Sequence, residues 1–218
     1  MTKPLIKLCG NRSLKDLQIT SQSNADYLGF IFAKSKRRVE PNQVKEWLKE
    51  VDINDKQLVA IFVNAKLKEL ENVMNELPID VIQCHGTESV NETAEIKTLF
   101  NKTVWKALPH FEGTLSAMRA FKDTADGFVI DSKVKDAFGG TGQTFDWSRV
   151  PLYSNAAKKM NKTLFIAGGI QPDNVVELLG HNPEGIDISS GIEQNEKKDK
   201  ALLDRLEERV NQHVFISR

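Results

Sequence analysis

Short apolar runs alternate along this chain with longer segments in which apolar residues recur every three or four positions. The short runs are rich in β-branched and aliphatic residues, and they occupy 5–9, 27–32, 58–63, 80–84, 103–108, 127–131, 163–168 and 185–189. Runs of this length between turn-forming residues are typical of buried strands, whereas the longer period is typical of amphipathic helices. The pattern therefore predicts eight strands separated by helices.

The predicted helices include 13–22, 42–51, 66–77 and 88–100. A last helix is predicted over 197–213, with Leu202, Leu203, Leu206 and Val210 on one face. Eight strands, each followed by a helix and with no linker between them, predict that residues 1–218 form a single-domain (β/α)8 barrel. A doubly wound open sheet is the alternative, but the strand count and the lack of a dinucleotide fingerprint argue against it.

Composition narrows the class of protein further. The chain has 30 basic and 30 acidic side chains, so its formal net charge is zero and no basic stripe indicates a nucleic-acid partner. Its first apolar stretch, PLIKLC at 4–9, is too short for a membrane span or a signal-peptide core. Two cysteines form neither a disulfide framework nor a zinc-ligand pattern. We expect a cytoplasmic protein with reduced thiols and no metal.

Candidate functional residues stand where the predicted strands end, which is where (β/α)8 barrels carry their active sites. They are Cys9 after the first strand, Arg37 after the second, His85 after the fourth, Asp131 at the end of the sixth, AGGI (167–170) after the seventh and SSG (189–191) after the eighth. Glycine-rich endings on the seventh and eighth strands of a barrel are typical of a phosphate site, because bare backbone N–H groups bind the anion.

Strand parity separates the two cysteines, because alternate residues face opposite sides of a sheet. Lys7 and Cys9 share one face of the first strand, and an unpaired lysine does not fit among the helices, so both are predicted to face the barrel interior. A thiolate is favoured beside a cation, which makes Cys9 the chemical candidate. Cys84 faces the helices, where a buried cysteine behaves as a small hydrophobe. Parity also places Asp187 beside Lys7 and predicts an ion pair.

The remaining candidates each have a structural alternative. Asp131 follows the apolar GFVI, so its carboxyl group is partly desolvated and suits a general acid, although such a residue also caps turns. His85 shares the inward face with Gln83 and is either a satisfied core histidine or a ligand-facing one. In KSKRR (34–38), all cations except Arg37 are expected to be solvated, and EKKDK (196–200) is expected to begin an exposed helix.

The segment KDAFGGTGQTFDW (135–147) concentrates three glycines in four positions. It is not a P-loop, because Gln143 stands where lysine is needed, and Phe145 replaces the third glycine of a dinucleotide fingerprint. Together with KLCG (7–10), SKRRV (35–39), QCHG (83–86), DSK (131–133), AGGI and DISSGIE (187–193), it resembles the phosphoribosylanthranilate isomerase family. The resemblance runs from end to end of the chain.

That resemblance implies an isomerase of tryptophan biosynthesis that performs an Amadori rearrangement without a metal or an organic cofactor. It implies that Cys9 is the general base, Asp131 the general acid and Arg37 the group that binds the anthranilate carboxylate. The other substrate-binding residues that it implies are His85 and Asp187, with Gly168, Gly169, Ser190 and Gly191 around the phosphate. The glycine-rich loop is expected to close over the intermediate, with TFDW (144–147) anchoring its far end.

The expected partner is a small phosphosugar–anthranilate substrate, with no nucleic acid and no membrane, and the chain is expected to be a monomer or a homodimer. Two alternatives stay open. A phosphate-barrel isomerase of histidine biosynthesis uses a carboxylate where Cys9 stands, so the thiol argues against it. A non-catalytic phosphosugar-binding or thiol-sensing barrel would keep the phosphate site and need no acid opposite the thiol.

Overall fold

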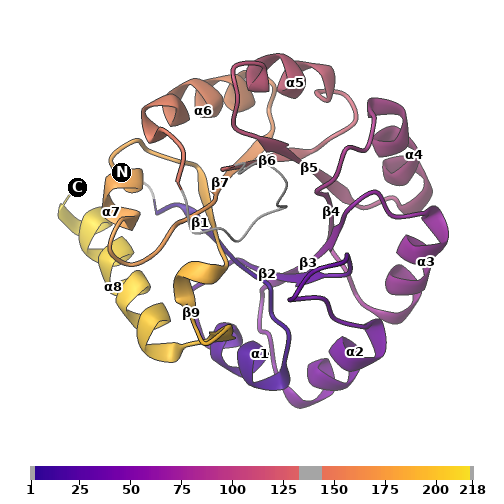
Figure 1. Ribbon diagram of the computed structural model, residues 1–218, viewed down its shortest axis with the longest axis horizontal. Coiled ribbons are helices and arrows are strands. Elements are labelled where there is room, and N and C mark those ends of the chain that lie inside the picture. The colour runs from indigo at the N-terminus through magenta and orange to yellow at the C-terminus, as the bar shows by residue number, and fades with distance from the viewer. Residues whose placement is uncertain (1–2, 133–143, 217–218) are drawn as a thin grey trace.

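The computed structural model describes residues 3–132 and 144–216, and it forms a closed barrel of eight parallel strands with helices outside (Figure 1). The strands are β1 (Leu5–Cys9), β2 (Tyr27–Ile31), β3 (Gln57–Phe62), β4 (Val81–Cys84), β5 (Thr103–Pro109), β6 (Gly127–Asp131), β7 (Thr163–Ala167) and β8 (Gly185–Ile188). Each strand pairs with the next along the chain, and β8 closes the barrel against β1. The predicted (β/α)8 fold is confirmed.

The strands alternate with helices that cover the outside of the barrel. The helices are α1 (Leu14–Ser21), α2 (Pro41–Glu50), α3 (Leu67–Glu76), α4 (Val90–Phe100), α5 (Thr114–Ala120), α6 (Val150–Lys159), α7 (Val175–Leu179) and α8 (Lys200–Ile216). Local sequence fixes several of their starts, because Ser13 and Ser89 each accept a hydrogen bond from the backbone of the first turn. No helix in the described ranges is long and apolar enough to cross a membrane.

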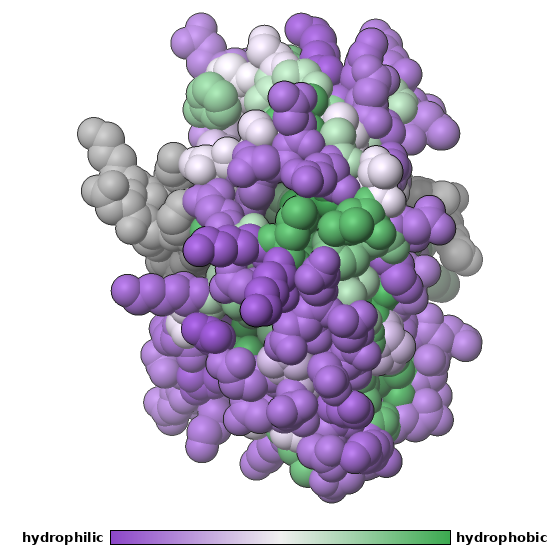
Figure 2. Space-filling view, turned by 90° about the vertical axis from the view of Figure 1, so that its right-hand side faces the viewer, coloured by the Kyte–Doolittle hydropathy of each residue, from purple (hydrophilic) through white to green (hydrophobic). Residues whose placement is uncertain are grey.

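Alternating strand residues build two apolar layers. Leu8, Leu28 and Phe30 are fully buried between the strands and the helices. Inside the barrel, the rings of Trp105 and Phe165 pack with their centroids 4.8 Å apart. Seen from the side of α3 and α4, the surface is mainly hydrophilic, with its most prominent hydrophobic patch near the centre of the view (Figure 2).

Two strand glycines leave the room that these large rings need. A Cβ atom at Gly127 would lie 2.7 Å from the Trp105 ring, and one at Gly185 would lie 2.6 Å from the Phe165 ring. The aromatic layer therefore fills the lower barrel, and the polar inward residues gather at the C-terminal mouth.

The segment before the last helix differs from the prediction. Instead of a helix from residue 197, the chain forms a short antiparallel hairpin of β9 (Glu193–Gln194) and β10 (Lys197–Lys198), and α8 begins only at Lys200. Asn195 and Glu196 turn the hairpin with φ values of 50° and 62°, which a two-residue I′ turn requires. The expectation of an exposed helix start at 196–200 is wrong because Lys198 is buried.

Candidate active site

A cavity of about 670 Å³ opens at the C-terminal ends of the strands. Its lining includes every predicted site residue except one: Cys9, Arg37, His85, Asp131, Gly168, Gly169, Asp187 and Ser190. The exception is Gly191, whose backbone packs against that of Ile170 so closely that a Cβ atom would lie 1.8 Å from the Ile170 carbonyl oxygen. The structure thus brings the candidates together, and Gly191 permits a close backbone approach behind the cavity.

Lys7 and Asp187 form the expected ion pair beneath Cys9. β1 and β8 place them in direct register, and the Lys7 Nζ atom lies 2.6 Å from Asp187 Oδ2. Burial alone lowers the pKa of Lys7, but the Asp187 carboxylate and Cys9 together more than offset this, so the pKa is raised. The Lys7 side chain, which is fully buried, therefore keeps its charge inside the barrel.

Lys7 lowers the pKa of the Cys9 thiol as expected, but it does not decide the net direction of the shift. Burial raises the pKa of the Cys9 thiol, and the Asp187 carboxylate adds to that rise against the opposing effect of Lys7. The physical reason is that burial disfavours a charged thiolate more than the nearby Lys7 ammonium favours it, and the Asp187 carboxylate adds to the effect of burial. Cys84 faces the helices as predicted, and burial raises its pKa to about 12.

His85 faces the cavity and points toward Asp131. Its Nε2 atom lies 3.5 Å from Asp131 Oδ2, and its Nδ1 atom lies 2.9 Å from the amide nitrogen of Gln83. An amide nitrogen can only donate, so Nδ1 accepts and a neutral ring carries its proton on Nε2. Gln83 is buried and shares the inward face as predicted. The contact between Gln83 and His85 therefore directs the His85 Nε2–H group toward the Asp131 carboxyl group at the end of β6.

Arg37 is the buried member of its basic run, and Lys34, Lys36 and Arg38 are exposed as expected. Burial alone lowers the pKa of Arg37, but the hydrogen bonds and negative charge of Glu193, with smaller effects of Cys9 and Glu196, together outweigh it and raise that pKa. Its guanidinium donates to both carboxylate oxygens of Glu193, at 2.8 and 2.6 Å. Arg37 therefore reaches the cavity as a fixed, permanently charged group.

The backbone that follows β7 and β8 forms another part of the cavity lining. Gly168 and Gly169 have φ values of +90° and +66°, in the left-handed region that favours glycine. A Cβ atom at Gly168 would lie 2.0 Å from the Ser132 hydroxyl and 2.7 Å from Asp131 Oδ1. Ser190 begins a short 3-10 helix, η2 (Ser190–Ile192), which follows the neighbouring strand β8. These features match the backbone surroundings expected of a phosphate site.

The glycine-rich part of the predicted lid, 135–143, lies outside the described residues. Its far end is described, and Phe145 stacks on His110 with ring centroids 4.4 Å apart. The Tyr153 hydroxyl lies 2.9 Å from His110 Nδ1, and Trp147 is buried at the start of the 3-10 helix η1 (Trp147–Arg149). TFDW is therefore packed against the barrel, as an anchor requires.

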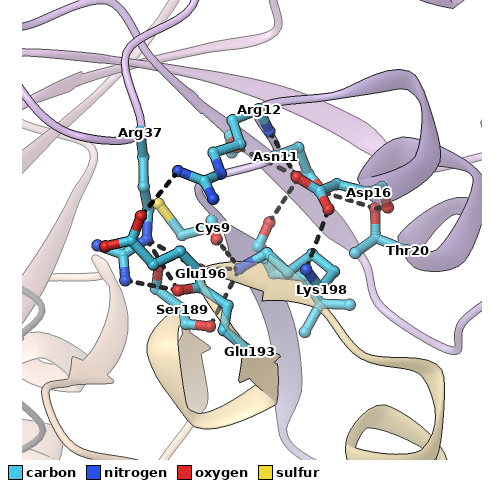
Figure 3. Close-up of polar contacts among 12 residues, drawn as sticks. Cys9, Asn11, Arg12, Asp16, Thr20, Arg37, Ser189, Glu193, Glu196 and Lys198 are labelled. Carbon is cyan, nitrogen blue, oxygen red and sulfur yellow. Dashed lines mark hydrogen bonds and ion pairs between the residues drawn. The ribbon is translucent and has the colours of Figure 1, made fainter.

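Two residues of the site were not predicted, namely Glu193 and Lys198. The Lys198 ammonium donates to the backbone oxygens of Cys9 and Ser189, at 2.6 and 3.0 Å, and to Glu193 at 2.9 Å (Figure 3). The only signal in the sequence was Glu193 at the end of the quoted DISSGIE motif. In the described part of the chain, no group of three or more His, Cys, Asp or Glu residues could hold a metal ion.

The closed barrel and its mouth place the protein among the (β/α)8-barrel enzymes that act at the C-terminal ends of their strands. The profile of the family described as N-(5'-phosphoribosyl)anthranilate (PRA) isomerase matches residues 6–209. The chain therefore belongs to the N-(5'-phosphoribosyl)anthranilate isomerase family.

Individual relatives agree over the full length of the chain. The N-(5'-phosphoribosyl)anthranilate isomerases of Bacillus subtilis and Bacillus licheniformis are 50% and 48% identical to it, each with 100% of both chains covered. A crystal structure of the Thermotoga maritima phosphoribosyl anthranilate isomerase is 26% identical, with a TM-score of 0.83 over 96% of this chain and 99% of that one.

Proposed function

We propose that this chain isomerises N-(5'-phosphoribosyl)anthranilate to 1-(2-carboxyphenylamino)-1-deoxyribulose 5-phosphate in tryptophan biosynthesis, with Asp131 as general acid and Cys9 as general base. Membership of the isomerase family supports the activity. The observation that supports the two roles is that a carboxyl group on β6 and a thiol on β1 line one cavity from different sides of the barrel mouth. A small sugar between them is accessible to an acid and a base at once.

The chemistry follows in two proton transfers that involve Asp131 and Cys9, and then a tautomerisation. Asp131 gives its proton to the furanose ring oxygen, the bond from that oxygen to C1 breaks, and the anthranilate nitrogen lone pair forms a C1=N Schiff base. The Cys9 thiolate then removes the proton from C2, and the freed electron pair forms a C1=C2 bond and neutralises the nitrogen. The resulting enolamine tautomerises to the C2 ketone as the C2 hydroxyl loses its proton and C1 takes one up.

The other residues of the cavity bind the substrate in this proposal. Arg37 binds the anthranilate carboxylate, for which a planar guanidinium is suited. Gly168, Gly169 and Ser190 receive the phosphate, with Gly191 behind them. Asp187 Oδ1 is buried and has no hydrogen-bond partner within the described residues, so it is available to accept from a sugar hydroxyl, while His85 lies beside the acid.

The raised pKa of the Cys9 thiol has a consequence for the pH profile. The working pair, a thiolate with a carboxylic acid, carries the same number of protons as a thiol with a carboxylate. The ratio of the two forms is therefore independent of pH while the pair holds one proton. We expect kcat/KM to stay flat across neutral pH, to fall in alkali above the ordinary pKa of a thiol as the pair loses its proton, and to fall in acid as the pair gains a second one. Initial rates in constant-ionic-strength buffers measure this, and a tenfold rise per pH unit near neutrality would contradict it.

Mixing the purified protein with N-(5'-phosphoribosyl)anthranilate tests the activity directly. Catalysis is read as loss of anthranilate-type fluorescence that depends on protein concentration. A non-catalytic phosphosugar-binding barrel would bind the product and leave the fluorescence of the substrate unchanged. We place the activity in the cytoplasm and the chain as a monomer or a homodimer, and the Thermotoga maritima protein is described as dimeric.

Changing Arg37 to methionine should raise KM roughly ten- to hundredfold and change kcat much less. A charged hydrogen-bonded contact contributes about 1.5–3 kcal/mol, and a carboxylate far from the reacting carbons is bound equally in the ground and transition states. Steady-state kinetics measure both constants. The control is Arg38→Met, because the neighbouring Arg38 is exposed and pairs with Glu40 at 3.1 Å. A fall in kcat alone would make Arg37 catalytic.

A further inference from the structure

We propose that Glu193 is the positioning residue that orients Arg37 toward the substrate carboxylate, and that Lys198 keeps the cluster positively charged. The inference rests on the proposed function, because it assigns the selectivity of the same cavity for a substrate with a carboxylated ring. Neither residue lines the cavity, and both act through Arg37.

Glu193 occupies one edge of the Arg37 guanidinium. Oε1 accepts from Nε at 2.8 Å, and Oε2 accepts from Nη2 at 2.6 Å. Among the described residues, the Arg37 side chain donates to no other group. A guanidinium holds its five N–H groups in one plane, so fixing one edge also fixes the direction of the free edge formed by Nη1 and Nη2. That free edge matches the two oxygens of a carboxylate.

Lys198 offsets the negative charge that Glu193 brings next to Arg37. A glutamate alone would cancel the charge of Arg37 and weaken its attraction for an anion. The Lys198 ammonium lies 2.9 Å from Glu193 Oε1, so the three side chains together carry one net positive charge while Lys198 is protonated. Burial lowers the pKa of Lys198, and the Glu193 carboxylate opposes that fall. Lys198 is buried, and all three of its ammonium protons have acceptors, namely the backbone oxygens of Cys9 and Ser189 and the Glu193 carboxylate. It therefore also ties the ends of β1 and β8 to the cluster.

The β9–β10 hairpin (193–198) holds the cluster in place. Glu193 and Lys198 are directly paired across it, and the Lys198 backbone N–H donates to Asp16 Oδ1 of α1 at 3.0 Å. At the turn, exposed Glu196 reaches Lys36 at 2.9 Å. It also reaches Arg12 at 3.4 Å (Figure 3). The hairpin thus carries two glutamates with cationic partners, one buried beside Arg37 and one at the surface. The second is a natural control for the first.

Kinetics of Glu193→Gln, with Glu196→Gln as the matched control, test the inference. The glutamine has one acceptor oxygen, so it cannot bind the guanidinium edge with two. We expect Glu193→Gln to raise KM about tenfold with kcat changed less than about threefold, and Glu196→Gln to stay within about twofold of the unchanged protein on both constants.

Inhibition by the product and by its phenylamino analogue, which lacks the ring carboxylate, separates orientation from general damage. The unchanged protein should prefer the carboxylated compound, and Glu193→Gln should reduce this preference about tenfold. Equal weakening of both compounds would show a merely structural role and overturn the inference. An unchanged preference in an active protein would overturn it as well, whereas failure of the unchanged protein to consume substrate would overturn the proposed function instead.

The double variant Glu193→Gln/Lys198→Met covers the case in which the single variant does not fold. It removes both charges of the buried pair, so the net charge around Arg37 stays at one positive unit. We expect the preference for the carboxylated compound to be reduced in this variant too, because the Arg37 guanidinium still lacks the carboxylate that binds one of its edges. Full retention of the preference would show that Arg37 needs no orienting partner.

Discussion

Asp131→Asn and Cys9→Ser should each lower kcat about 10²- to 10⁴-fold, the usual contribution of a positioned acid or base. Asparagine cannot give a proton to the ring oxygen, and a serine hydroxyl is a far weaker base than a thiol at neutral pH. Affinity for the product should stay within about tenfold, because a lost proton transfer costs rate rather than binding. Fluorescence assays under saturating substrate measure kcat, and product inhibition measures the affinity.

Cys84→Ser is the matched control for the thiol. Cys84 is buried among the helices and does not line the cavity, so this change should cost stability and leave activity per folded molecule intact. If Cys84→Ser lost activity and Cys9→Ser lost only stability, the two cysteines would have to exchange their assigned roles. Near-normal turnover in Asp131→Asn would remove Asp131 from the mechanism.

Lys7→Met and Asp187→Leu should each lower the free energy of unfolding by about 3–5 kcal/mol, because each leaves one unpaired charge in the barrel. The Lys7 side chain is fully buried and that of Asp187 is 7% exposed, so water cannot replace the lost partner. The double variant should recover much of the loss, since methionine and leucine leave no charge behind. Urea unfolding of the four proteins measures the coupling energy.

Additive losses in that cycle would show that the 2.6 Å contact contributes no coupling to the folded state. Lys3→Met is a suitable control, because Lys3 is exposed and its ammonium, among the residues that the structure describes, donates only to the Asn24 carbonyl, at 3.3 Å. Stable folding of Asp187→Leu with loss of activity would instead assign the Asp187 carboxylate chiefly to the substrate.

The fold and most of the site could be predicted because their signals are local. Alternation along each strand places Lys7 and Cys9 inward and Cys84 outward, and barrel closure then puts Asp187 beside Lys7. Motifs at the strand ends supply the other candidates that line the cavity. Each of these inferences needs only the position of a residue within its own strand and the order of the strands.

What could not be predicted depends on several elements at once. Lys198 looks like one of five charges in an exposed run, and only the hairpin turn at Asn195 and Glu196 directs it inward. The protonation of Cys9 depends on a balance of burial, Lys7 and Asp187 that strand parity alone cannot weigh. The role of Gly191 depends on the backbone of the preceding loop, which comes within contact distance only in the folded barrel.

The ion pair at the base of the site also bears on how the chain folds during synthesis. Lys7 and Asp187 are separated by 180 positions. At about 5–20 residues per second, the ribosome needs about 9–36 s to deliver the carboxylate after the lysine has been made. During that interval the first strand cannot bury its cation, so it stays near water while the other strands accumulate. Closure of the barrel, and with it the completion of the site, therefore waits for the last strand of the nascent chain.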